Sequence, residues 1–204
     1  VRKFFVKEKG VIKPRDKKSN YVKRALGIPG DTIEIKDGII FINGQKNILP
    51  DRAKPIFTYN IKSDQGVSSN KLKEIGIEGF IRKFIIKNLT PRSYEEISNY
   101  ILSISNTNDN EYLVYTDDSG IPLSIIRDNN INISELIDST REISLTYEDA
   151  FKIENSNLFD TIYRVTQSKG VSNLNFFPNN NNFKWNNDYL GPIYIPKKGD
   201  QIDL

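Results

Sequence analysis

The stretch YVKRALGIPGDTIEIKDGIIFING, residues 21–44, decides the fold of the N-terminal part of this chain. Its first six residues, 21–26, have the composition of a short strand. The next five, Gly27-Ile28-Pro29-Gly30-Asp31, stop that strand, because proline fixes φ and glycine permits a positive φ. Gly27, Pro29, Gly30 and Asp31 are therefore expected to shape a turn.

A β-hairpin is predicted directly after this turn. Residues 32–36 alternate polar and apolar side chains, as a half-buried strand does. Asp37-Gly38 is a type I′ turn signal, residues 39–42 form the return strand, and Asn43-Gly44 provides another turn.

The character of the sequence changes from about residue 48 onward. Ser93 and Glu96 have the spacing of a capping box, and apolar side chains follow at helical intervals, so a helix is predicted over 94–104. Thr146, followed by Asp149, predicts the start of a second helix. Strands are predicted at 111–115 and 121–126, around the turn 117–120.

The fold class expected from these signals is mainly β, with a β core interrupted by an α+β insertion. The core takes residues 1–47 and 176–204, and the insertion takes 48–175. Residues 176–189 contain an asparagine-rich run of low complexity, which predicts a surface loop. Strand signals then resume at 193–195, before a Pro-Lys-Lys-Gly-Asp turn at 196–200.

Three residue types are missing from all 204 residues: histidine, cysteine and methionine. Without histidine, Ser-His-Asp catalysis and imidazole zinc sites are excluded within this chain. Without cysteine, so are disulfides and thiolate nucleophiles. Because the chain lacks methionine at position 1, we expect it to be part of a longer protein. No apolar run approaches the ~18–20 residues that span a bilayer, so any membrane anchor is expected to lie outside these residues.

The net charge of +3 conceals an uneven distribution. Residues 1–24 carry ten Lys and Arg against two acidic residues, a balance of +8, and the rest of the chain sums to −5. Such a basic arm could attract anionic lipid or nucleic acid, although a solvated lysine-rich loop is the simpler interpretation. No nucleic-acid-binding motif accompanies the arm, so no nucleic-acid partner is expected.

Residues 21–31 resemble the lysine box of type I signal peptidases, in which a strand ending in Lys-Arg runs into Gly-x-Pro-Gly-Asp. The hairpin with Ile42-Asn43-Gly44 continues the resemblance. The C-terminal stretch LGPIYIPKKG, residues 190–199, resembles a branch of the family with a long insertion. Around 145–154 the insertion itself is loosely similar to that branch.

The resemblance implies that Lys23 is the general base of a Ser–Lys dyad. A lysine acts as a base only when neutral, and its unperturbed pKa is about 10.4. Burial in an apolar site lowers the pKa of a lysine. Alternation places Lys23 on one strand face with Tyr21 and Ala25, and neither offers a carboxylate. The resemblance also implies that Tyr21 and Val22 lie on the strand against which an extended substrate pairs.

Two motifs of the family are absent from these 204 residues. One is the serine box, in which a serine precedes a Pro-Thr pair by two residues. The other is the later Gly-Asp-Asn-Arg box, which Asn186-Asn187-Asp188 does not match. Both are expected outside the chain, so this fragment alone is predicted to be inactive.

The resemblance implies a membrane-bound endopeptidase that cleaves signal peptides from exported preproteins, on the outer face of the bacterial cytoplasmic membrane. Expected partners are signal peptides, the lipid surface and translocation machinery, and no metal or organic cofactor is implied. Two alternatives stay open: a non-catalytic signal-peptidase-like binding module, and a Ser–Lys self-cleaving regulator. Asp117-Asp118 is read as an acidic turn in preference to a cation site. The glycosylation sequons at 88–90 and 132–134 are short enough to arise by chance.

Overall fold

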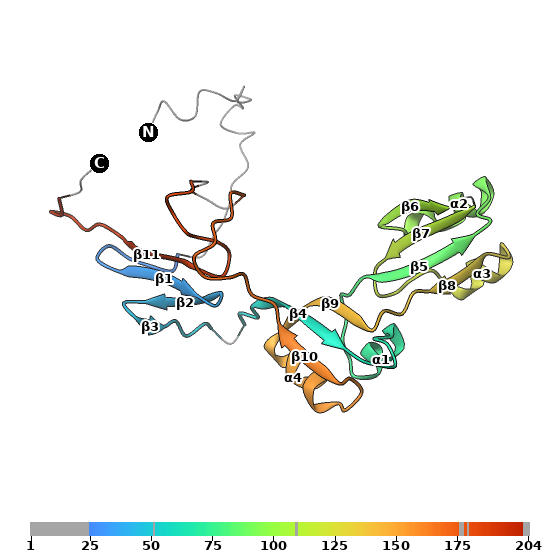
Figure 1. Cartoon of the computed structure of the whole chain (residues 1–204), viewed down its shortest axis with the longest axis horizontal. Helices are drawn as coiled ribbons and strands as arrows, with labels where there is room; N and C mark the ends of the chain where they lie inside the picture. The colour runs from blue at the N-terminus through green and yellow to red at the C-terminus, as the bar shows by residue number, and fades with distance from the viewer. Residues whose placement is uncertain (1–24, 51, 109, 176–177, 179, 202–204) are drawn as a thin grey trace, which may run out of the picture.

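A computed structural model describes residues 25–50, 52–108, 110–175, 178 and 180–201. These residues form three antiparallel sheets connected by short helices and loops. From one end of the molecule to the other we call them the hairpin sheet, the middle sheet and the distal sheet (Figure 1). The prediction of a mainly β fold is confirmed.

The hairpin sheet has the strand order β11-β1-β2-β3. Its strands are β1 (Thr32–Lys36), β2 (Ile39–Ile42), β3 (Gln45–Lys46) and β11 (Leu190–Tyr194). The register places Ile33 opposite Ile42 and Lys36 opposite Ile39. Asp37 and Gly38 have φ values of 49° and 65°, the two positive values that a type I′ turn requires. The predicted hairpin is therefore confirmed.

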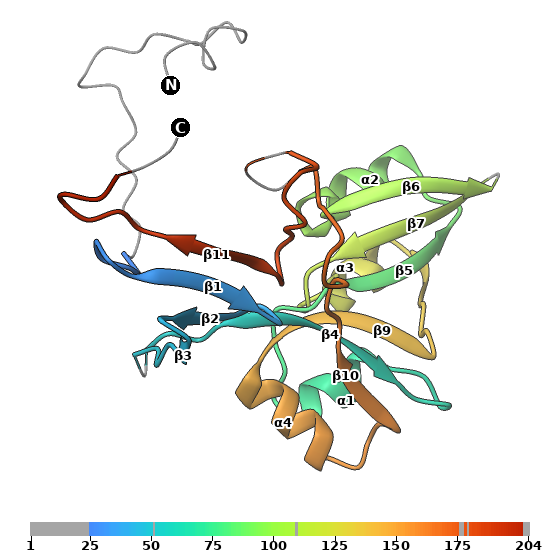
Figure 2. The same ribbon diagram turned by 60° about the vertical axis from the view of Figure 1, so that its left-hand side comes forward.

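The middle sheet carries the larger hydrophobic core. Its order is β10-β4-β9, from β4 (Ile56–Lys62), β9 (Thr140–Thr146) and β10 (Thr161–Arg164). The helices α1 (Ser69–Glu74) and α4 (Tyr147–Asn155) lie on the same side of it (Figures 1 and 2). Thr146 caps α4, its hydroxyl accepting the Asp149 amide at 3.2 Å as its sequence position predicts. The buried apolar side chains are Tyr59, Ile61, Val67, Leu72, Ile77, Phe80, Ile143, Leu145, Ala150 and Ile153.

The distal sheet has a separate core. Its order is β6-β7-β5-β8, from β5 (Arg82–Lys87), β6 (Ser103–Asn108), β7 (Glu111–Thr116) and β8 (Asn132–Glu135). It is accompanied by α2 (Pro91–Ile97), the 3₁₀ helix η2 (Ser98–Tyr100) and α3 (Leu123–Asp128). The buried apolar side chains are Phe84, Ile86, Ile97, Val114 and Ile121.

The predicted helix over 94–104 is only partly correct. The helix α2 begins earlier, at Pro91, with Thr90 as the N-cap accepting the Ser93 amide at 3.1 Å. Proline is favoured at the first helical position, because its missing N–H would be unpaired there anyway. Ser93 is therefore inside the helix, and the chain turns into strand β6 from Ser103 onward.

The strand predicted at 121–126 is wrong, because this segment enters helix α3 after Pro122. A short apolar run has no periodicity that separates a strand from one helical turn. Ile125 and Ile126 instead pack, partly buried, against the core of the distal sheet. The turn 117–120 before it is confirmed, since the Asp117 carboxylate accepts the amides of Ser119 and Gly120.

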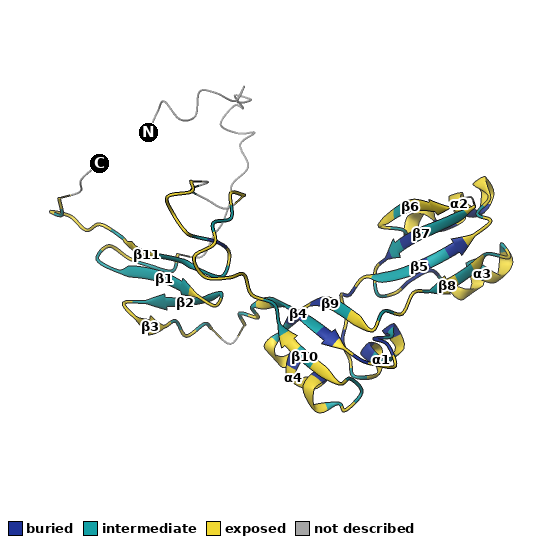
Figure 3. Cartoon of the chain, viewed as in Figure 1, coloured by how far each residue is buried: buried dark blue, intermediate teal, exposed yellow. Residues whose placement is uncertain are grey.

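Burial differs between the three sheets (Figure 3). Several apolar residues of the middle and distal sheets are buried, such as Ile61 and Ile86, whereas none of the described residues of β1, β2, β3 and β11 is. Yet β2 reads Ile-Ile-Phe-Ile, a continuous apolar run typical of a strand covered on both faces. Within the described residues, no helix is long and apolar enough to cross a bilayer.

Candidate functional site

The three site residues predicted from the sequence, Lys23, Tyr21 and Val22, lie outside the described residues. The structure describes the lysine box from Ala25 onward. The candidate site is therefore built from the turn that follows the lysine and from the segments that hold this turn.

The carboxylate of Asp31 organises the turn. Its Oδ2 accepts the amide of Ile28 at 2.9 Å, and its Oδ1 accepts the side-chain Nδ2 of Asn43 at 2.8 Å. The Oδ1 of Asn43 in turn accepts the amide of Thr32 at 2.9 Å. Hydrogen bonds from the Ile28 amide and then from Asn43 lower the pKa of Asp31, because they favour the charged carboxylate.

Glycine is favoured at positions 27 and 30 of the turn for two different physical reasons. A Cβ atom on Gly27 would lie 2.5 Å from Cδ1 of Ile195 and 2.6 Å from Cδ1 of Ile33, so a side chain there would displace these two methyl groups. Gly30 has a φ of 99°, a conformation that residues with a Cβ rarely adopt. The expectation that these positions are structural agrees with this geometry.

The turn is bonded to the C-terminal stretch. The amide of Gly30 donates to the carbonyl of Ile195 at 2.8 Å, and the amide of Ile195 donates to the carbonyl of Asp31 at 2.8 Å. These bonds extend the pairing of β11 with β1. Two segments of the family resemblance, 27–31 and 190–199, are thus brought side by side.

A second carboxylate fixes the turn after β11. Oδ2 of Asp200 accepts the hydroxyl of Tyr194 at 2.6 Å and the amide of Lys197 at 2.9 Å. These two hydrogen bonds, first that of Tyr194, lower the pKa of Asp200, and the same bond raises the pKa of Tyr194. Asp31 and Asp200 are acceptors of turn hydrogen bonds, so the described part of the site is a scaffold.

Among the described residues, no cluster of three or more carboxylate, imidazole or thiol side chains could hold a metal ion. Asp117 and Asp118 accept backbone amides, Asp118 that of Gly79 at 2.6 Å. Their positions fit the acidic-turn interpretation.

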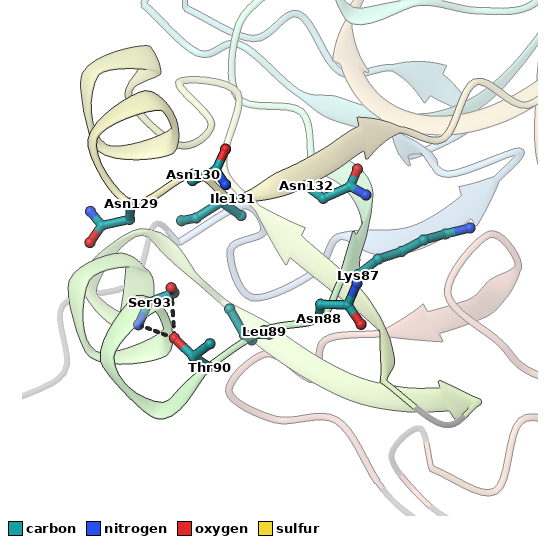
Figure 4. Close-up of a pocket in the computed structure, with 9 residues that line it drawn as sticks. All are labelled: Lys87, Asn88, Leu89, Thr90, Ser93, Asn129, Asn130, Ile131 and Asn132. Carbon is teal, nitrogen blue, oxygen red and sulfur yellow. Dashed lines mark hydrogen bonds between the residues drawn. The ribbon is translucent and has the colours of Figure 1, made fainter.

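A polar pocket of about 660 Å³ lies in the distal sheet, far along the chain from the lysine box (Figure 4). Asparagine side chains line much of it, including the acceptor positions of both sequons, Asn88 and Asn132. The hydroxyl of its Ser93 is bonded to that of Thr90 at 2.9 Å, and its only ionisable group, Lys87, lies 3.7 Å from Glu111. Such amides can bind a neutral polar molecule by hydrogen bonds, but they supply no nucleophile activated by a base.

Two contacts of this turn are not among the predictions made from the sequence: Asn43 as the partner of Asp31, and Ile195 packed over Gly27. The contact of Asn43 with Asp31 could have been predicted, because Asn43 lies in a predicted turn and a two-strand hairpin brings its two ends together. The contact of Ile195 with Gly27 has no local sequence signal, since the pairing of β11 with β1 joins segments on opposite sides of the insertion.

Part of the chain is similar to proteins of a known family. The family described as "Signal peptidase, peptidase S26" matches residues 8–90. Signal peptidase IB of Staphylococcus aureus strain Mu50 is 39% identical over 61 residues, which cover 29% of this chain and 29% of that protein. Signal peptidase I P of Bacillus subtilis subsp. natto is 33% identical over 66 residues, 32% of this chain and 33% of that protein.

The matched segments thus span only about a third of these relatives. No solved structure gives a significant match. The matched range includes the whole lysine box, the turn fixed by Asp31, and the hairpin. Residues 8–90 are therefore similar to the signal peptidase family, and the resemblance of the lysine box to type I signal peptidases is confirmed.

Proposed function

We propose that the parent protein is a membrane-bound serine endopeptidase that removes signal peptides from exported preproteins. The observation that carries this proposal is the family match over residues 8–90, which includes Lys23. The hydrogen-bonded turn after the lysine supports it, because Asp31 and the two glycines give a rigid end to the strand that would carry the base.

Lys23 would act as the general base toward a serine outside residues 1–204. Its neutral amine accepts the hydroxyl proton while the serine oxygen attacks the scissile carbonyl, and the proton then passes to the leaving amine. The resulting acyl-enzyme is hydrolysed by a water that Lys23 deprotonates. This requires a lysine whose pKa is well below 10.4, which a desolvated position would provide.

The substrate would bind in an extended form along the strand that contains Tyr21 and Val22. Backbone hydrogen bonds would supply affinity, and small side chains next to the cut would fit shallow pockets. The active site would face the outer side of the membrane, and the basic residues 1–24 would be attracted to anionic headgroups.

The proposed domain organisation is a catalytic β core, 1–47 with 176–204, interrupted by the insertion 48–175. The middle and distal sheets lie within the insertion, and each has its own core.

Preprotein cleavage by the full-length parent in detergent tests the base. We expect Lys23→Ala and Lys23→Arg each to lower kcat by at least about a hundredfold, because neither can accept the serine proton near neutral pH. Lys46→Ala, on the exposed strand β3 of the same hairpin, is the matched control and should cleave normally. A Lys23→Ala protein that is folded and cleaves like wild type would exclude this site assignment.

The alternatives predict other outcomes. A non-catalytic binding module would bind signal peptides but cleave none, while a control peptidase cuts the same substrate. A self-cleaving regulator would cut its own chain and no preprotein. Lys23-dependent cleavage by the purified 204-residue chain would contradict the expectation that the nucleophile lies outside it.

A further inference from the structure

The hairpin sheet and the middle sheet meet at a small cluster of side chains from distant parts of the chain. Arg164, the last residue of β10, lies with its guanidinium carbon 3.8 Å from the ring centre of Phe57 on the neighbouring strand β4. Desolvated contacts of this kind between a cation and an aromatic ring are attractive. The ring therefore fixes the direction in which the guanidinium points.

The guanidinium points at the tip of the hairpin. Its Nη2 donates to the carbonyl of Asp37 and lies 3.7 Å from Oδ1 of Asp188. Both the Arg164 and Asp188 side chains are only 18% exposed, so this pair is much less screened than a surface ion pair. The Nε of Arg164 is buried and has no partner among the described residues, which leaves Nη2 and the ring to hold the side chain.

Asp188 contacts both sides of the junction. Its backbone carbonyl accepts the amide of Gly38 at 2.8 Å, and its Oδ2 accepts the amide of Gln167 at 2.8 Å. The neighbouring Tyr189 donates its hydroxyl to Oδ1 of Asp37. The segment before β11 is therefore bonded to the hairpin tip and to the chain leaving β10.

Gly38 shows how closely the two sheets approach. A Cβ atom at this position would lie 2.5 Å from Nη2 of Arg164 and 3.0 Å from Oδ1 of Asp188. The type I′ turn already requires a positive φ here, and a Cβ atom would in addition displace the guanidinium of Arg164.

We infer that Phe57, Arg164 and Asp188 form an interface that locks the hairpin sheet to the middle sheet in one orientation. We call these three residues the hairpin clamp. Without the clamp, the sheets would be joined by the connections that follow β3 and β10, whose described residues belong to no helix or strand. The clamp thus sets how the insertion is presented beside the lysine-box hairpin, whether or not the parent is a peptidase.

Distance measurements between two spin labels test this inference directly. The chain has no cysteine, so Lys46→Cys on the hairpin sheet and Lys73→Cys on α1 of the middle sheet would be the only labelling sites. We expect one narrow distance distribution in the otherwise unchanged 204-residue chain. Arg164→Gln should broaden or shift the distribution, and should speed exchange of the Gly38 amide hydrogen by about tenfold or more.

Lys62→Gln is the matched control. Lys62 is another cation above an aromatic ring on the middle sheet, 5.4 Å from the ring centre of Tyr163, at the end of β4 away from the hairpin. Lys62→Gln should leave both the distance distribution and the exchange rate of the Gly38 amide unchanged. Gly38→Ala provides a second test from the hairpin side, since its methyl group would collide with the clamp.

Folding of each variant is checked by the amides of Ile61 and Arg141, which pair at the end of β4 and β9 away from Phe57. If Arg164→Gln and Gly38→Ala both fold and keep the wild-type distance distribution, the clamp does not set the orientation. The same conclusion follows if the Lys62 control broadens the distribution as much as Arg164→Gln does.

Discussion

Asn186 is the residue whose replacement tests the structure of the asparagine-rich C-terminal segment most sharply. Its side chain is fully buried, although the sequence around it has the composition of a surface loop. Its Nδ2 donates to the carbonyls of Ser168 at 3.0 Å and Val171 at 2.8 Å. Its Oδ1 accepts the amides of Asp188 and Tyr189, both at 3.0 Å.

Replacement of Asn186 by alanine removes four hydrogen bonds at once. A hydrogen bond contributes about 1 kcal/mol net, which gives about 4 kcal/mol for the four. Asp188 and Tyr189 are only half-buried, so water can satisfy their amides, and the expected loss falls to about 3 kcal/mol. For a chain of this size that corresponds to a lower Tm by about 6–12 °C.

The measurement is thermal unfolding of the 204-residue chain, followed by hydrogen exchange of the amides in 168–189. Asn187→Ala is the matched control, because Asn187 is the same residue type next along the chain and is exposed. It should change the free energy of unfolding by less than about 0.5 kcal/mol. Asn186→Asp should destabilise at least as much as alanine, because it turns a carboxylate oxygen toward two carbonyls. Equal stability of Asn186→Ala and Asn187→Ala would refute the reasoning.

Three further predictions concern the distal, hairpin and middle sheets, one each. Burial would raise the pKa of Glu135, but hydrogen bonds from Arg82 and Ser69 outweigh it and lower the pKa. The stability this gives is present above the unfolded pKa of about 4.3 and lost as pH falls through the folded pKa. Glu135→Gln should therefore lower the free energy of unfolding by about 2–3 kcal/mol at pH 7. Measured by urea denaturation at several pH values, this free energy should also fall less steeply with decreasing pH in the variant than in the wild type, and an equally steep fall would contradict the prediction. Gly191→Ala should destabilise more than Gly44→Ala in thermal melts: both glycines have positive φ, but only at Gly191 would the Cβ lie 2.7 Å from a β1 carbonyl oxygen. Thr146→Ala should cost about 1 kcal/mol by removing the α4 cap, and Thr146→Ser should recover most of it in the same assay.

The parts of the fold that could be predicted from sequence are those with local chemical causes. The hairpin follows from alternation and from Asp37-Gly38, whose backbone conformation few other residue pairs adopt. The cap at Thr146 follows from a side chain bonding its own neighbours. The helix at α2 was placed too late, because two hydroxyl residues three positions apart, Thr90 and Ser93, both resemble an N-cap.

The parts that could not be predicted depend on contacts across the chain. The run from residue 121 becomes a helix because it packs on the distal core, and the sequence of residues 121–126 does not by itself reveal this contact. The burial of Asn186 depends on carbonyls from 168 and 171, and the clamp depends on Arg164 meeting the hairpin tip. The role of Lys23 lies outside the described residues and stays a prediction.

The pairing of β11 with β1 has a consequence for how this protein could change in evolution. Ile33 lies opposite Ile193, so the pairing of β1 with β11 closes a loop of about 160 residues and brings both ends of that loop to the same sheet. The entropic cost of closing such a loop grows only with the logarithm of its length, about 0.6 kcal/mol for each doubling. This loop could therefore lengthen, shorten or acquire a new sheet with little effect on the stability of β1 and β11, provided that its two ends still meet beside the turn held by Asp31.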